Sequence, residues 1–314
     1  GFLVAVTLKM VPAKKYVRLE YHPIKSQAEL IERFENESEK ENPHDFVEGI
    51  VYGHEESVLL LGDQVDKKGS DGKKNRIGLW FKPWFYTHIE KMLKKDATTV
   101  EYIPLRQYYH RHTRPLFWMM HHVIPAGNHP LYRFLFGWAI PPQMSLMKYF
   151  ETETTRALRE KHAVTQDMLV PMSSLKVSLD HFHENYNMYP LWLCPMAVYE
   201  KENELGIIHP KYHEDGTKEE MFVDIGAYGM GNVPDFDGIE ALKQTEQFVI
   251  EHDGYQAMYA KTMLSEEDFR KMFDHSYYDK IRDEIPLARK AFPDFYNKLN
   301  NKARIAPAAY KKLK

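Results

Sequence analysis

The chain has 314 residues, of which 43% are hydrophobic and 28% are charged, and its net charge at pH 7 is −3. This length allows one large domain or two small ones, and the apolar content argues against disorder over most of it. The weakly acidic balance gives no electrostatic argument for nucleic-acid binding. The single cysteine, Cys194, excludes a disulfide within the chain and suits a reducing compartment.

The N-terminal part of the chain is expected to consist mainly of strands. Residues 1–12 are rich in β-forming residues and end at a proline, and we interpret them as the last strand of a domain that began upstream. Apolar runs predict three further strands, at residues 16–22, 45–52 and 57–65. Ser26 is a suitable N-cap for a helix after the first of these. A Lys- and Gly-rich loop is predicted at 66–76, and an amphipathic helix after Pro83.

The most apolar stretch covers residues 116–150. Four prolines and Arg133 interrupt it, so it does not read as a helix that spans a bilayer. Its aromatic and aliphatic side chains indicate either core packing or an exposed apolar surface that inserts into a membrane interface. The sequence leaves both interpretations open.

The C-terminal half repeats the mixture of helices and strands. Pro171 predicts the start of a helix, because an apolar stripe follows it at helical spacing. The stripe consists of Met172, Leu175, Leu179, Phe182 and Tyr186. A second helix is predicted at 239–251, strands are predicted at 189–193, 221–228 and 255–260, and the glycines at 226, 229 and 231 predict a turn. This order predicts an α+β fold in which helices pack on one face of a mainly antiparallel sheet.

The densest polar cluster is the string YYHRHTR at residues 108–114. In an extended segment alternate side chains share a face, so His110, His112 and Arg114 would point the same way. Such a face could bind a metal, hold a phosphate or carboxylate, or supply a proton, although no third metal ligand stands at a suggestive spacing. Asp167, just before the predicted helix, could cap that helix or face a ligand.

Several strings together resemble one family. They are GFLVAVTLKMVPAKKYVRL, DFVEGIVY, KPWFYTHIEKML, EYIPLRQYYHRHTRPLFW, PLYRFLFGWAIPP, TQDMLVPMSSL, YPLWLCP, VDIGAYG and RKMFDHSYYDKIR. In this order and at similar separations they are similar to the delta-24-sterol reductases, a family of the FAD-linked oxidase group. The resemblance runs from Gly1 to about Arg304.

The resemblance implies a domain division. The family has an FAD-binding domain and a cap domain, whose antiparallel sheet covers the flavin and shapes the substrate pocket. By this resemblance residues 1–12 are the last strand of a truncated FAD-binding domain, 13–302 are the cap, and 303–314 are a frayed tail. The family also implies a cytosol-facing location at the endoplasmic reticulum membrane, with the anchor outside this chain, and it leaves the oligomeric state open.

The implied reaction is reduction of the sterol side-chain C24=C25 bond, with NADPH reducing FAD and the reduced FAD reducing the sterol. An alkene without an electron-withdrawing group needs a positioned acid, and aromatic walls would tolerate transient positive charge. The resemblance implies that Gly1 and Phe2 lie near the flavin. The other roles are our hypotheses from residue chemistry: proton donor His110, His112, Tyr108 or Tyr109, with Asp167 orienting it; flavin contacts from Lys82 and Arg114; substrate contacts from Trp118, Phe136, Trp138, Tyr189 and Trp192.

Two other functions remain open at this point. One is an oxidase of the same architecture that acts on another substrate. The apolar segment at residues 116–150 argues against a sugar as that substrate. The other is a non-catalytic sterol-binding module that has kept the cap fold. The sequence also does not separate a 24(25) from a 24(28) double bond.

Overall fold

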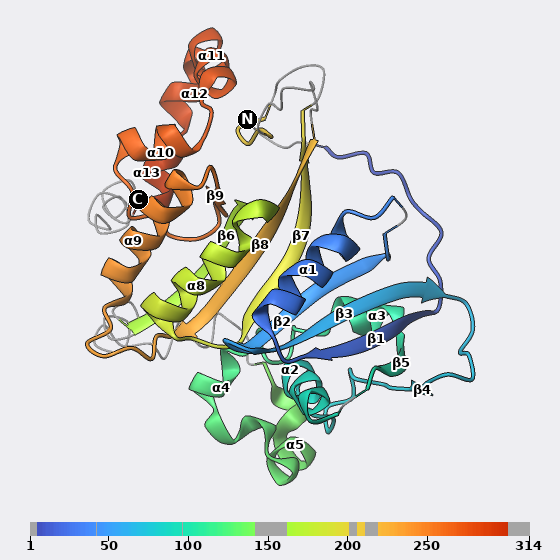
Figure 1. The fold of residues 1–314 in the computed structure, drawn as a ribbon. Helices are drawn as coiled ribbons and strands as arrows, with labels where there is room; N and C mark the ends of the chain where they lie inside the picture. Colours follow the sequence, from blue (N-terminus) through green and yellow to red (C-terminus); the bar gives the residue numbers. More distant parts are fainter. Residues whose placement is uncertain are drawn as a thin grey trace.

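A computed structural model describes residues 5–41, 43–95, 97–141, 162–200, 206–210 and 219–300. Its centre is a nine-stranded sheet in the order β4-β5-β1-β3-β2-β7-β8-β6-β9 (Figure 1). The strands are β1 Tyr16–Ile24, β2 Phe46–Gly53, β3 Glu56–Val65, β4 Lys73–Lys74, β5 Thr99–Pro104, β6 Ala163–Pro171, β7 Leu191–Tyr199, β8 Glu219–Met230 and β9 Tyr255–Gln256. All neighbouring pairs are antiparallel except β4 and β5. The predicted α+β class with a mainly antiparallel sheet is confirmed.

The three longest helices of the described residues lie on one face of this sheet. Figure 1 shows α1 and α8 crossing the sheet, with α9 beside α8. They are α1 Gln27–Ser38, α8 Leu175–Tyr186 and α9 Gly238–Glu251. Their apolar stripes and the strand residues beneath them form the largest buried cluster. Ser26 caps α1 as predicted, since its side chain accepts a hydrogen bond from the Glu29 amide.

Short helices cover part of the opposite face. They are α2 Phe85–Glu90, the 3-10 turn η1 Lys91–Lys94, and α3 Leu105–Tyr109. Residues of β3 divide between the two faces, because Leu59 and Leu61 pack under α1 and α8 while Val58 and Leu60 pack under α2 and η1. The sheet is therefore covered by helices on both sides, with the long helices on one of them.

The remaining helices lie at the two ends of the sheet (Figure 1). Near α2 lie α4 Met120–Val123, η2 Pro125–Asn128, α5 Pro130–Phe136 and η3 Gly137–Ala139. The turn η4 Met172–Ser174 leads into α8, and the C-terminal group is α10 Glu266–Met272, α11 Ser276–Glu284, α12 Pro286–Ala291 and α13 Phe295–Leu299. No helix of the described residues is long and apolar enough to cross a membrane.

Several local predictions are wrong. Residues 108–114 are not extended: α3 ends at Tyr109 and turns follow, so alternate side chains do not share a face. Gly226 and Gly229 lie inside β8 and not in a turn. Pro171 ends β6, and α8 begins only at Leu175.

The strand predicted within residues 1–12 is not found in its described part: residues 5–14 are exposed and do not pair with any strand of the sheet. The proposed domain boundary at residue 12 stays a prediction. Gly1, Phe2 and the tail at 303–314 lie outside the described residues.

Candidate functional site

The sheet face opposite α1, α8 and α9 carries a group of polar side chains. The register pairs Trp192 of β7 with Gly226 of β8, and Gly226 with Asp167 of β6. Residues two apart along a strand share a face, so Asp224 and Tyr228 flank Gly226 on this side. We call this surface the polar face; it consists of Glu48, Asp167, Trp192, Cys194, Asp224, Gly226 and Tyr228.

At one end of the polar face, Glu48 of β2 is 2% exposed and fully paired. Arg111 donates from Nε to one carboxylate oxygen at 3.0 Å and from Nη2 to the other at 2.7 Å. Trp192 Nε1 donates to the second oxygen at 2.9 Å. Burial opposes ionisation, but the Arg111 charge outweighs it and holds the pKa of Glu48 well below its usual range. This end is a permanent ion pair.

His112 lies beside this ion pair. Its side chain is 9% exposed and stacks on Phe117 with ring centroids 4.8 Å apart. Nε2 stands 3.7 Å from Glu48, and neither ring nitrogen makes a hydrogen bond. Burial lowers the pKa of His112, so the ring is neutral at pH 7.

At the other end, a buried carboxyl group, Asp167, and a half-buried one, Asp224, have no cation beside them among the described residues. Tyr228 donates a hydrogen bond to Asp167, and an oxygen of Asp224 is buried without a hydrogen-bond partner. Burial raises the pKa of Asp167 to about 6, while burial and the Asp167 charge raise that of Asp224 to about 8. Neither has an ion-pair partner in the described part of the chain. This end of the polar face can hold a proton at neutral pH.

Gly226 leaves the space in which the two side chains meet. A Cβ at this position would stand 2.8 Å from the Tyr228 hydroxyl oxygen and 2.9 Å from Asp167 Oδ1. Both distances are shorter than ordinary van der Waals contact, so a larger residue would displace the hydrogen-bonded pair.

The turns after α3 lay two aromatic rings over the polar face. Phe117 contacts the rings of Trp192 and Tyr228, with centroids 5.2 and 4.7 Å apart, and Trp118 contacts Tyr228 at 5.6 Å. Leu116 and Phe117 adopt positive φ angles of 45° and 60°. Such angles are strained for non-glycine residues and are often found at functional sites, where packing holds them.

The predicted catalytic residues are not all brought together. His112 and Asp167 lie at opposite ends of the polar face. Tyr108 is fully buried and donates to Glu48 at 3.4 Å. His110 and Tyr109 are exposed, because α3 ends there and the chain turns outward.

The predicted cofactor contacts are also separated. Arg114 donates to the carbonyl oxygens of Leu79, Lys82 and Pro83 at 2.6 to 3.1 Å, which are the contacts of a structural residue. Lys82 itself lines a small cavity beside α2, away from the polar face.

The predicted substrate contacts divide into three groups. Trp192 belongs to the polar face. Trp118 and Tyr189 line a neighbouring cavity. Phe136 and Trp138 are 52% and 72% exposed, far from a closed pocket.

Sequence reasoning missed Glu48, Arg111, Asp224 and Tyr228. Glu48 and Asp224 stand inside strand patterns that are otherwise apolar, FVEGIVY and MFVDIGAY. A lone carboxylate within such a run is a signal, because an acid on a covered sheet face needs a partner or shifts its pKa. Among the described residues, no group of three or more His, Cys, Asp or Glu could hold a metal ion.

No protein-family model matches the chain. Solved structures of cholesterol oxidase, one of them from B. sterolicum, align with 12% identity over 76% of this chain and 46% of theirs, at a TM-score of 0.32. A score this low carries no argument about fold or function.

Relatives of known name match much more closely. The Delta(24)-sterol reductase of Homo sapiens is 42% identical over 304 residues, which cover 97% of this chain and 57% of the human protein. That of Rattus norvegicus is 43% identical with the same coverage, and that of Arabidopsis thaliana is 38% identical over 90% of this chain and 54% of the plant protein. The chain is therefore homologous to the Delta(24)-sterol reductases over almost its entire length, and it spans little more than half of theirs.

Proposed function

We propose that the protein carrying this chain is an FAD-dependent, NADPH-driven reductase of the sterol side-chain C24=C25 bond, and that this chain supplies the substrate site. The observation that carries the proposal is the 42% identity with the human Delta(24)-sterol reductase over 97% of the chain. The two raised carboxyl pKa values on the polar face support it independently, because the reaction needs an acid.

The chemistry explains that need. The alkene has no electron-withdrawing group, so a proton added to C24 must place positive charge on C25, the more substituted carbon, before a hydride arrives there. When bound, FAD would supply that hydride after its own reduction by NADPH. The tasks left to the protein side chains are to hold the proton, exclude water and tolerate the charge.

The carboxyl pair of the polar face suits the first task. Asp224, with a pKa near 8, keeps its proton at pH 7, and Asp167, hydrogen-bonded by Tyr228, supplies the nearby negative charge that raises the Asp224 pKa. His112 is the weaker candidate, because its lowered pKa leaves it without the extra proton at pH 7. We assign the proton to Asp224 and the orienting role to Asp167.

The polar face also fits a flavin ring. Phe117 and Trp192 are only half-buried, and their rings suit contact with a flat aromatic group. The same two rings could stabilise transient positive charge on the substrate.

An apolar surface at α5 and η3 supports access from a membrane. None of the seven residues of α5 is buried, and Phe134 and Trp138 are 67% and 72% exposed. Exposed apolar area of this kind is typical of membrane or protein contact. Together with the family resemblance it supports a location at the endoplasmic reticulum membrane. Vesicle binding that persists after both residues are replaced by Asp, with the fold intact, would argue against this part of the proposal.

The test follows flavin absorbance without oxygen, in protein that contains this chain and binds FAD. NADPH should bleach the flavin, and desmosterol should restore it with formation of cholesterol. Reoxidation by oxygen but not by desmosterol would indicate an oxidase or another substrate, and absence of bleaching would favour a sterol-binding module.

A variant series tests the proton assignment. Asp224→Asn should slow reoxidation by desmosterol by about 10²–10⁴-fold while bleaching by NADPH is unchanged. Asp66→Asn, in the exposed loop, is the matched control and should react like the unmodified protein. Normal reoxidation in Asp224→Asn would remove this carboxyl from the mechanism.

A further inference from the structure

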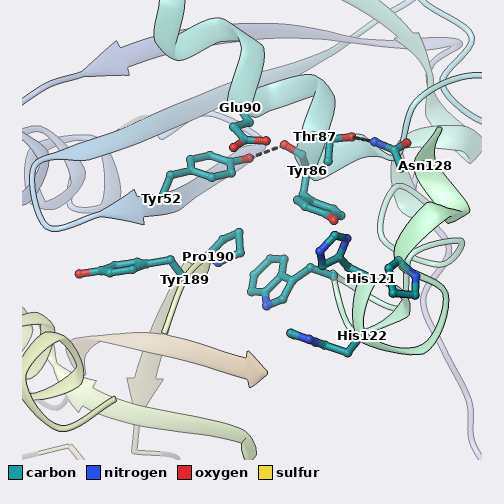
Figure 2. Close-up of a pocket in the computed structure, with 11 residues that line it drawn as sticks. Tyr52, Tyr86, Thr87, Glu90, His121, His122, Asn128, Tyr189 and Pro190 are labelled. Atoms are coloured by element: carbon teal, nitrogen blue, oxygen red, sulfur yellow. Dashed lines mark hydrogen bonds between the residues drawn. The ribbon is translucent and has the colours of Figure 1, made fainter. Parts of the chain in front are cut away.

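A cavity of about 370 Å³ lies next to the polar face. Figure 2 shows it between α2, which contributes Tyr86 and Glu90, the ends of β2 and β7, marked by Tyr52 and Tyr189, and α4 with His121 and His122. Its volume falls in the range of small-molecule sites, which is about 300–1,000 Å³. The reaction proposed above does not use these polar residues.

The frame of the cavity is fixed by hydrogen bonds that use up several of its polar groups. The Tyr52 hydroxyl donates to the Tyr86 carbonyl, and Asn128 donates to Thr87 at 2.8 Å (Figure 2). The Asn128 carbonyl oxygen accepts from the Trp84 amide at 2.9 Å. These bonds tie η2 to α2, so the shape of the cavity is set without a ligand.

Three polar side chains on the wall remain uncommitted. Glu90, His121 and His122 are exposed to solvent, and none of their side chains makes a hydrogen bond or ion pair with another residue that the structure describes. Burial and the neighbouring His121 lower the pKa of His122, so its neutral ring offers an acceptor nitrogen. Figure 2 places Glu90 and His122 on opposite sides of the cavity, so each offers a separate acceptor to a ligand that donates a hydrogen bond, such as a hydroxyl group.

The rest of the wall is aromatic. Tyr52, Tyr86, Trp118 and Tyr189 provide flat apolar surface. Trp118 is 2% exposed and contacts both Tyr86, at 6.1 Å between ring centroids, and Tyr228 of the polar face, at 5.6 Å. Trp118 therefore connects the cavity to Tyr228, which donates its hydrogen bond to Asp167.

We propose that this cavity binds the hydroxyl-bearing ring end of the sterol, with Glu90 accepting the hydrogen bond from the hydroxyl group. The inference rests on the proposed function. A sterol is elongated and rigid, with its hydroxyl at one end and its side-chain alkene at the other. A site that recognises the hydroxyl must therefore be separate from the acid, and the cavity is separated from Asp167 by the rings of Trp118 and Tyr228.

The test compares two ligands that differ only at the hydroxyl. Binding of desmosterol and of its 3-methyl ether to the FAD-loaded protein is measured by competition against the fluorescent sterol dehydroergosterol. The unmodified protein should prefer desmosterol by roughly 10- to 100-fold, the range for a hydrogen bond to a charged acceptor. Glu90→Ala should bind the two ligands about equally.

Controls separate this inference from the proposed function. Lys94→Ala, on the neighbouring turn and outside the cavity, should keep the preference, and so should Asp224→Asn, which should lose only turnover. A preference for desmosterol that is unchanged in Glu90→Ala would overturn the assignment of the cavity. A preference for desmosterol that is lost in Glu90→Ala, together with absent turnover in the unmodified protein, would instead leave the cavity assigned and refute the reductase proposal.

Discussion

The two ends of the polar face contain the same kind of group in opposite electrostatic states. Glu48 is buried and meets a bidentate arginine, an indole N–H and a phenol. Asp167 is also buried and Asp224 is half-buried, but within the described part of the chain their only hydrogen bond from a side chain is the one from Tyr228 to Asp167. Burial acts in the same direction at both ends, so the arginine decides the outcome: the pKa falls at Glu48 and rises at the two aspartates.

This difference distinguishes a structural carboxylate from one available for chemistry. A paired carboxylate cannot take up or release a proton near pH 7, so it fixes geometry. An unpaired buried carboxyl holds a proton that a substrate can accept, at a cost in stability. The first end of the polar face positions the loop over the site, and the second carries the proposed chemistry.

Among substitutions compared at neutral pH, breaking the ion pair should give the largest effect on stability. Glu48→Ala leaves the Arg111 guanidinium buried and unpaired, and we expect a loss of about 3–5 kcal/mol in the free energy of unfolding. Urea unfolding measures it, and Glu29→Ala, which removes a surface pair with Arg33, should change it by less than about 1 kcal/mol. Similar losses in both variants would contradict a special role for the buried pair.

The pH dependence of stability should come from the end of the polar face that carries Asp167 and Asp224. Because folding raises the pKa of Asp167 to about 6 and that of Asp224 to about 8, the folded chain binds more protons than the unfolded chain between roughly pH 4 and 8. The contribution of these groups is therefore present at low pH and is lost as the pH rises through 6 and 8. We expect a decrease on the order of 5 kcal/mol between pH 5 and 8, most of it from Asp224.

Asp224→Asn should remove much of this decrease, because the amide does not titrate. Unfolding of both proteins across the pH range checks the expectation. An identical pH dependence in the variant would show that Asp224 titrates normally and would weaken its assignment as the acid.

Substitution of Gly226 should sharpen the comparison, since it affects one end only. In Gly226→Ala the added methyl group presses on Tyr228 and Asp167, and overpacking of this kind costs about 1–3 kcal/mol. Thermal unfolding measures this cost. Turnover should fall as well, whereas the NMR resonance of the Arg111 Nε–H group, which donates to Glu48, should change little. A large shift of that resonance would indicate that the two ends are not independent.

The smallest effect is expected at His110. Its side chain is exposed, so His110→Ala should alter stability by less than about 0.5 kcal/mol and leave turnover unchanged. His112→Ala is the informative partner, because that ring is buried between Phe117 and Glu48. Loss of turnover in the His110 variant would restore His110 of the YYHRHTR string as a candidate proton donor.

Local patterns alone predicted β1, β2, β3, α1, α8 and α9, because apolar periodicity and the Ser26 cap act within a few residues of each other. They did not predict β6, in which Thr165, Gln166 and Asp167 interrupt the apolar run. Nor did they predict the turns after α3, where packing against the sheet overrides local preference.

What the sequence determined by itself is thus the strand and helix periods of most of the sheet and the string-by-string resemblance to the sterol reductases. Only the tertiary structure decided which polar residues meet. Glu48 and Arg111 are 63 residues apart, and Asp167 and Tyr228 are 61 apart. Such pairs arise from strand register and from the packing of a distant loop, and their protonation depends on burial, which no local pattern encodes.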